Sequence, residues 1–139
     1  MNPLANENPT TPDTVLVVEG EVIVRAAIAQ YLRDCGYRVL EAGDAKEAIT
    51  VLQEPTIAVD VVLSAIEISG PMDGFGLSQW AKAHRPDAYV LLAGTLQRAA
   101  STAADLCEQG PMLARPYQPE TVVERIKQLL AERARRKPK

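Results

Sequence analysis

The chain has 139 residues, which is the length of one ordinary domain. Hydrophobic residues make up 47% and charged residues 24%, a balance typical of a folded protein rather than a disordered one. The formal net charge is −3, and no apolar run approaches the roughly 20 residues that span a bilayer, which excludes an integral membrane protein. The polar N-terminus lacks the pattern of a secretory signal, so we expect a cytoplasmic protein.

The predicted elements alternate between short apolar runs and helix-length segments. Residues 1–13 contain three prolines among polar residues and are predicted to be a disordered lead-in, followed by one domain over residues 14–130. Strands are expected at residues 14–18, 37–42, 59–65, 88–93 and 112–114. Helices are expected at residues 21–35, 44–53, 73–85, 96–109 and from 119 to about 130. Asp44 and Asp73 are expected to cap the second and third of these helices.

The C-terminal residues differ from the rest of the chain in charge. Residues 131–139 hold five basic residues and one acidic residue, whereas residues 1–130 hold ten basic and 17 acidic residues. An acidic body argues against nucleic acid as a partner. We interpret the basic end as a solvated tail, with a contact to an acidic partner as the alternative. Cys35 and Cys107 have no C-x-x-C partner and are expected to be free thiols.

This alternation predicts an α/β fold. Strands connected by helix-length crossovers form a parallel sheet with helices on both faces, and five units are too few for an eight-stranded barrel. We therefore expect a doubly wound five-stranded sheet of flavodoxin-like strand order 2-1-3-4-5. The functional site of such a sheet lies at the carboxyl ends of its strands, where the sequence places Glu19, Gly20, Ala65, Ala93 and Arg115.

Four segments in this order and spacing resemble the receiver domain of bacterial two-component response regulators. They are VLVVEGEVIVR, YLRDCGYRVLEAGDAKEAI, MDGFGL and RPYQPETVVERI, and the resemblance covers residues 14–130. It implies phosphoryl transfer from a histidine kinase to an aspartate at the end of the third strand. It also implies two acidic residues that hold Mg²⁺, a hydroxyl after the fourth strand and a lysine after the fifth. The cation and the ammonium offset the repulsion between the phosphoryl group and the carboxylates.

The chain departs from this pattern at most of the pocket positions. Glu19 retains the first acidic position. The changed positions are Gly20 for the second acid, Ala65 for the phosphoacceptor, Ala93 for the hydroxyl, Arg115 for the lysine and Met112 for the aromatic switch residue. The resemblance therefore implies a degenerate receiver, or pseudo-receiver.

An alanine methyl group cannot accept a phosphoryl group, so we expect no reaction at Ala65. Ser64 is expected to point to the opposite face of the strand, and Glu67 lies in the following loop, so neither is a convincing substitute. Glu19 alone is a poor Mg²⁺ site, and Mg²⁺ binding is expected to be weak or absent. Arg115 either pairs with Glu19 in the vacated pocket or points to solvent.

The sequence favours a receiver-like module of two-component phosphorelay signalling that is not an enzyme and binds proteins independently of phosphorylation. Its partner would be a histidine kinase, a downstream effector or a second copy, docked on the face formed between Leu96 and Leu130. Two alternatives remain open. One is phosphorylation at a non-standard acceptor, and the other is a flavodoxin-like ligand-binding protein. The turn after the first strand carries carboxylates rather than a glycine-rich phosphate cradle, which argues against a nucleotide enzyme.

Overall fold

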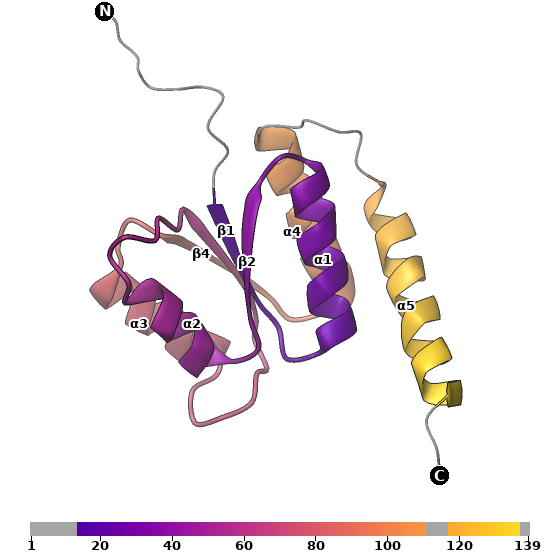
Figure 1. The fold of residues 1–139 in the computed structure, drawn as a ribbon, viewed down its shortest axis with the longest axis horizontal. Coiled ribbons are helices and arrows are strands. Elements are labelled where there is room, and N and C mark those ends of the chain that lie inside the picture. The colour runs from indigo at the N-terminus through magenta and orange to yellow at the C-terminus, as the bar shows by residue number, and fades with distance from the viewer. Residues whose placement is uncertain (1–13, 111–116, 137–139) are drawn as a thin grey trace, which may run out of the picture.

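A computed structural model describes residues 14–110 and 117–136, which fold around a parallel sheet (Figure 1). Its strands are β1 (Thr14–Val18), β2 (Arg38–Ala42), β3 (Val61–Ala65) and β4 (Tyr89–Ala93). They pair in the order β2-β1-β3-β4, which confirms the expected strand order for these four strands. The prediction of five strands is corrected to four within the described residues, because residues 112–114 lie outside them.

Helices connect the strands and complete the described part of the chain. They are α1 (Val22–Asp34), α2 (Ala45–Leu52), α3 (Gly74–His84), α4 (Leu96–Gln109) and α5 (Pro119–Arg136). Both predicted caps are confirmed, since Asp44 accepts a hydrogen bond from the Glu47 amide and Asp73 accepts one from the Gly76 amide, each at 2.9 Å. The last helix continues to Arg136, well beyond residue 130. Among the described helices, none combines the length and apolarity needed to cross a membrane.

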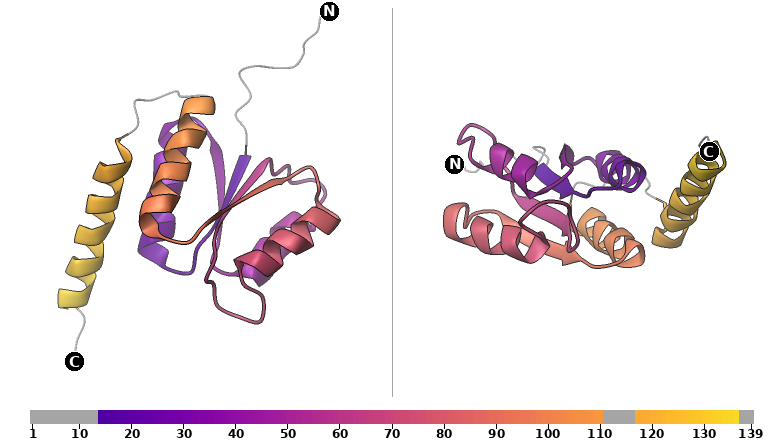
Figure 2. Two further views of the ribbon diagram at one scale, coloured as in Figure 1. Left: turned by 180° about the vertical axis from the view of Figure 1, so that it is seen from behind. Right: turned by 90° about the horizontal axis from the view of Figure 1, so that it is seen from below.

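The sheet separates two apolar clusters because successive side chains of a strand point to opposite faces. Val15 and Val17 of β1 pack into the cluster that contains buried residues of α1 and α4. Leu16 and Val18 pack into the second cluster, which contains buried residues of α2 and α3. The helices therefore cover both faces of the sheet, as the alternation of elements predicts (Figure 2).

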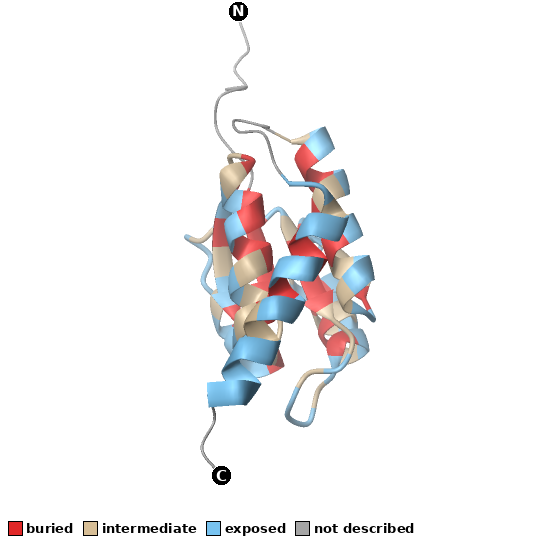
Figure 3. Cartoon of the chain, turned by 90° about the vertical axis from the view of Figure 1, so that its right-hand side faces the viewer, coloured by how far each residue is buried: buried red, intermediate tan, exposed pale blue. Residues whose placement is uncertain are grey.

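Helix α4 lies beside α1 on one side of the sheet, and α5 lies outside this pair (Figures 1 and 2). The contacts of α5 are mainly with α1 and α4 rather than with the strands. It buries Val122, Val123 and Ile126, while the outer face of the helix is largely exposed (Figure 3). The outermost layer of the described fold is therefore an amphipathic helix seated on two other helices.

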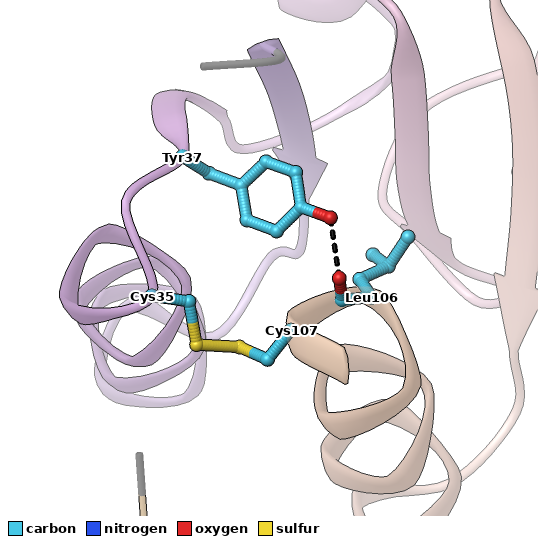
Figure 4. Close-up of a disulfide and its surroundings, with 4 residues drawn as sticks. All are labelled: Cys35, Tyr37, Leu106 and Cys107. Carbon is cyan, nitrogen blue, oxygen red and sulfur yellow. Dashed lines mark hydrogen bonds between the residues drawn. A yellow bond between two sulfur atoms is a disulfide. The ribbon is translucent and has the colours of Figure 1, made fainter. Parts of the chain in front are cut away.

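A disulfide joins Cys35 to Cys107, which makes the prediction of free thiols wrong (Figure 4). Their Cα atoms lie 5.6 Å apart, within the usual range for a disulfide. The two cysteines are 72 residues apart in sequence, so their pairing depends on α4 lying beside α1, which no local pattern reveals. Close to the bond, the Tyr37 hydroxyl donates a hydrogen bond to the Leu106 carbonyl of α4.

Candidate functional site

A cavity of about 240 Å³ lies at the carboxyl ends of β1, β3 and β4. The strand register places Ala65 of β3 directly beside Ala93 of β4, and both border this cavity together with Glu19. Most of the remaining lining is apolar: Val17, Val24, Ile28, Leu63, Ile66, Leu96 and Ala99. The structure thus brings three of the predicted site residues together at a cavity lined mainly by apolar side chains.

Glu19 is held by the backbone where β1 turns into α1. Its Oε2 accepts a hydrogen bond from the Glu21 amide at 2.9 Å, which satisfies one of the unpaired donors at the start of the helix. The Glu19 carbonyl accepts a hydrogen bond from the Arg25 Nη1 at 2.8 Å. The retained carboxylate therefore already has a partner at the N-terminus of α1, where its negative charge is favourable.

The end of β3 is closely packed against the start of α3. The Gly74 amide donates to the Ile66 carbonyl at 2.8 Å. A Cβ atom at Gly74 would lie 2.4 Å from the Ala65 carbonyl oxygen, so this close approach requires glycine. The sequence motif MDGFGL therefore contains a packing requirement, because its first glycine lets α3 begin directly against the strand that carries Ala65.

Ser64 is one of the residues that border the cavity. It is 1% exposed, and its hydroxyl donates a hydrogen bond to the Ala65 carbonyl at 2.8 Å. This hydrogen bond gives the hydroxyl a structural partner, a carbonyl, rather than a base that could activate it. The expectation that Ser64 points to the opposite face of the strand from Ala65 stays a prediction.

Two polar residues that sequence reasoning did not assign to the site also line the cavity. Thr95 is the N-cap of α4, and its hydroxyl accepts a hydrogen bond from the Arg98 amide at 3.0 Å. Glu67 follows β3 and is exposed. The signal for Thr95 was its position one residue before the predicted helix, which is typical of a cap rather than of a phosphate ligand.

The other predicted site residues lie apart from the cavity or outside the described residues. Gly20 is exposed, and a Cβ atom there would lie 3.6 Å from the Gly43 carbonyl oxygen, an ordinary contact. Arg115 and Met112 fall outside the described residues, so the Glu19–Arg115 pair stays a prediction. Within residues 14–110 and 117–136, no group of three metal-ligating side chains is gathered.

An ion pair near this edge connects α5 to the start of α1. Arg133 donates to both carboxylate oxygens of Glu21, at 2.9 and 2.6 Å. The hydrogen bond and charge of Arg133 hold the pKa of Glu21 below its usual value, against a smaller opposing effect of burial. Because both side chains are partly exposed, solvent screening makes the contribution of this pair to stability small.

Replacing Arg133 by glutamine is expected to lower the melting temperature slightly at neutral pH and to have less effect in acid. A carboxyl group whose pKa is lower in the folded state stabilises the protein above its unfolded pKa. That stabilisation is lost as the pH falls through the folded pKa of Glu21. Thermal unfolding of the wild-type protein and of Arg133→Gln, measured from neutral pH downwards, should show their melting temperatures approaching each other as the pH falls. Arg136→Gln, which removes only an exposed pair with Glu132, is the matched control. A difference in melting temperature that did not change with pH would contradict a stabilising pair between Arg133 and ionised Glu21.

The open parallel sheet, with its cavity at the carboxyl ends of the central strands, defines a flavodoxin-like α/β protein. The sequence matches the response regulator receiver domain family over residues 15–127, which is most of the chain. The chain belongs to this family, whose members are signalling modules of two-component systems.

Relatives and solved structures agree with this assignment. The chain is 34% identical over 79 residues to a cyclic di-GMP phosphodiesterase of Thermotoga maritima, covering 57% of this chain and 20% of that protein. It is 29% identical over 119 residues to the transcriptional regulatory protein AruR of Pseudomonas aeruginosa, covering 84% and 48%. The chain thus spans less than half the length of these curated relatives. The crystal structure of the receiver domain from the hybrid histidine kinase CckA is similar with a TM-score of 0.54 and 27% identity, covering 69% of this chain and 97% of that one.

Proposed function

We propose that this receiver domain signals as a protein-interaction module without phosphorylation of an aspartate at the usual position. The observation that carries the proposal is the pairing of Ala65 with Ala93 at the carboxyl end of the sheet. The resemblance to the receiver pattern implies that these residues stand where the family has its phosphoacceptor and its hydroxyl. Neither methyl group can accept a phosphoryl group or donate a hydrogen bond to one, so chemistry at these two positions is lost.

The environment of the two alanines supports the same proposal. The cavity is lined mainly by apolar side chains and carries no basic residue among the described ones, so it offers a dianionic phosphoryl group no compensating charge. Glu19 is the one acidic position of the family pattern that is retained, and its carboxylate accepts the Glu21 amide. We infer that Mg²⁺ binding is weak or absent here, because a single carboxylate is a poor site for this cation.

Under this proposal the domain signals by binding a protein partner rather than by accepting a phosphoryl group. The CckA likeness favours a histidine kinase or another phosphorelay protein as partner, and a downstream effector or a second copy would dock in the same manner. We place the docking surface on the face between Leu96 and Leu130, to which α4 and α5 contribute exposed residues in the described part. The proposed location is the cytoplasm, where such partners act, and the acidic body argues against nucleic acid.

Incubation with acetyl phosphate and Mg²⁺, followed by intact-mass spectrometry, tests the loss of phosphorylation. We expect an unchanged mass, because the described pocket offers no carboxylate at position 65. A phosphorylation-competent receiver domain treated in parallel establishes that the reagent is active. A phosphoryl adduct on this chain would contradict the proposal and favour a non-standard acceptor, which Glu67→Gln and Ser64→Ala variants would then locate. A small molecule retained in native mass spectra would instead favour a ligand-binding protein.

A further inference from the structure

We propose that Cys35 and Cys107 form a reversible redox site that controls how firmly α4 is held against α1. The substrates of this site are thiol–disulfide couples, such as a dithiol reductant and its disulfide. The inference goes beyond the interaction function proposed above and does not depend on it. It rests on where the disulfide lies, on what else holds α4, and on what the other end of α4 touches.

The disulfide joins two helix ends. Cys35 is the C-cap of α1, and Cys107 lies in the last turn of α4 (Figure 4). Both residues are almost fully buried, at 0% and 1% exposure. Helix ends open more readily than helix centres, so fraying at these two ends gives a reagent a route to sulfur atoms that are otherwise covered. A buried bond with such a route can exchange without unfolding of the whole domain.

The packing that otherwise holds α4 is composed mainly of small side chains. Besides Cys107, its buried residues are Ala100, Ala103 and Leu106, of which only Leu106 is large. Alanine contributes much less buried apolar area than leucine or isoleucine, so this face stabilises the docked helix weakly for its length. The hydrogen bond from Tyr37 to the Leu106 carbonyl lies at the same end as the disulfide. Reduction therefore removes the covalent restraint from a helix whose buried face consists mostly of small side chains.

The opposite end of α4 forms part of the cavity wall. Thr95, Leu96 and Ala99 at its start border the cavity beside Ala65 and Ala93. Helix α4 also packs against α5. A change in the attachment of α4 therefore alters both the cavity and the helix surface that the proposed function uses for docking. This geometry connects the redox state of two sulfur atoms to a candidate interaction surface.

The exchange is balanced with a dithiol as co-reactant. A thiolate of the reductant attacks one sulfur of the Cys35–Cys107 bond, forms a mixed disulfide and releases the other cysteine as a thiolate that takes up a proton. The second thiol of the reductant then displaces the remaining cysteine. Two electrons pass to the protein, which gains two thiols, and the reductant becomes a disulfide. A disulfide oxidant reverses the sequence.

Amide hydrogen exchange of the oxidised and dithiothreitol-reduced protein, followed by mass spectrometry, tests the proposal. Blocking of thiols with iodoacetamide measures how much of the protein is reduced under native conditions, and far-ultraviolet circular dichroism verifies that it stays folded. We expect reduction without denaturant and at least tenfold faster exchange in peptides that cover α4. Exchange in α2 and α3, which pack in the other cluster, is expected to accelerate less than exchange in α4, and only through the loss of overall stability.

The double variant Cys35→Ser/Cys107→Ser is the matched control. It should show the fast α4 exchange of the reduced protein and no response to dithiothreitol. If this variant does not fold, the reduced wild-type protein decides the question alone. Three results would overturn the proposal: free thiols in protein purified without reductant, a disulfide that resists native reduction, or exchange that is equal in the two forms. Acceleration by an equal factor in α4, α2 and α3 would also overturn it, because the bond would then stabilise the whole domain without a particular effect on α4.

Discussion

Replacing Gly74 by alanine is expected to destabilise the protein by about 3 kcal/mol, because the new methyl group would overlap the backbone of β3. The Cβ atom would lie 2.4 Å from the Ala65 carbonyl oxygen and 2.9 Å from the Ile66 Cα. Both are backbone positions, so relief requires α3 to move away from the sheet. That movement weakens the hydrogen bond from the Gly74 amide to the Ile66 carbonyl and the packing of Leu77 beneath it.

Urea or thermal unfolding measures the effect, which corresponds to a fall in melting temperature on the order of 10 °C for a domain of this size. Gly20→Ala is the matched control, since its methyl group would make only an ordinary contact at 3.6 Å. That variant should change the stability by less than about 0.5 kcal/mol. Equal stability of the two variants would contradict the close approach of α3 to the end of β3.

Removing the disulfide is expected to cost about 4 kcal/mol of unfolding free energy, estimated from the closure of a long loop in the unfolded chain. Cys35 and Cys107 are separated by 72 residues, and an unfolded chain without the bond gains the conformational freedom of that loop. The serine side chains add a smaller cost, since both positions are buried and a hydroxyl there needs a hydrogen-bond partner.

Urea titration of the wild-type protein and of Cys35→Ser/Cys107→Ser, both without reductant, measures the difference. Addition of dithiothreitol should bring the wild-type curve close to that of the variant and leave the variant unchanged. The single variants control for the hydroxyl effect, because each lacks the bond but introduces only one serine. A loss smaller than about 1 kcal/mol in the double variant would mean that the bond is not formed in solution.

The fold could be predicted from the sequence wherever a local pattern determined it. The α4 bounds at residues 96–109 follow from apolar spacing and from Gly110 after the helix, and β1 at 14–18 follows from an uninterrupted β-branched run. The caps Asp44 and Asp73 form the predicted hydrogen bonds because a side chain and an amide three residues apart meet at a helix start. The strand order followed from the general architecture of doubly wound sheets, since no local pattern carries it.

Contacts between distant segments could not be predicted in this way. The Cys35–Cys107 bond and the Arg133–Glu21 pair depend on where α4 and α5 lie, and each joins residues far apart in the chain. At the candidate site, the family resemblance singled out Glu19, Ala65 and Ala93, which border one cavity, while their roles there stay a prediction. It did not predict that Glu19 would accept an amide of α1, because the direction of a carboxylate is decided by the nearest donors rather than by its position in a motif.

The two apolar clusters share no residue, and one layer of strands lies between them. Substitutions on opposite sides of such a wall have few common neighbours, so their costs add rather than compound. The side with α2 and α3 can therefore keep its packing while substitutions accumulate and a covalent bond is added on the other side. Division of the interior in this way lets the sequence change on one side without loss of the fold. It gives a physical reason why a receiver architecture tolerates variation at the end of its sheet.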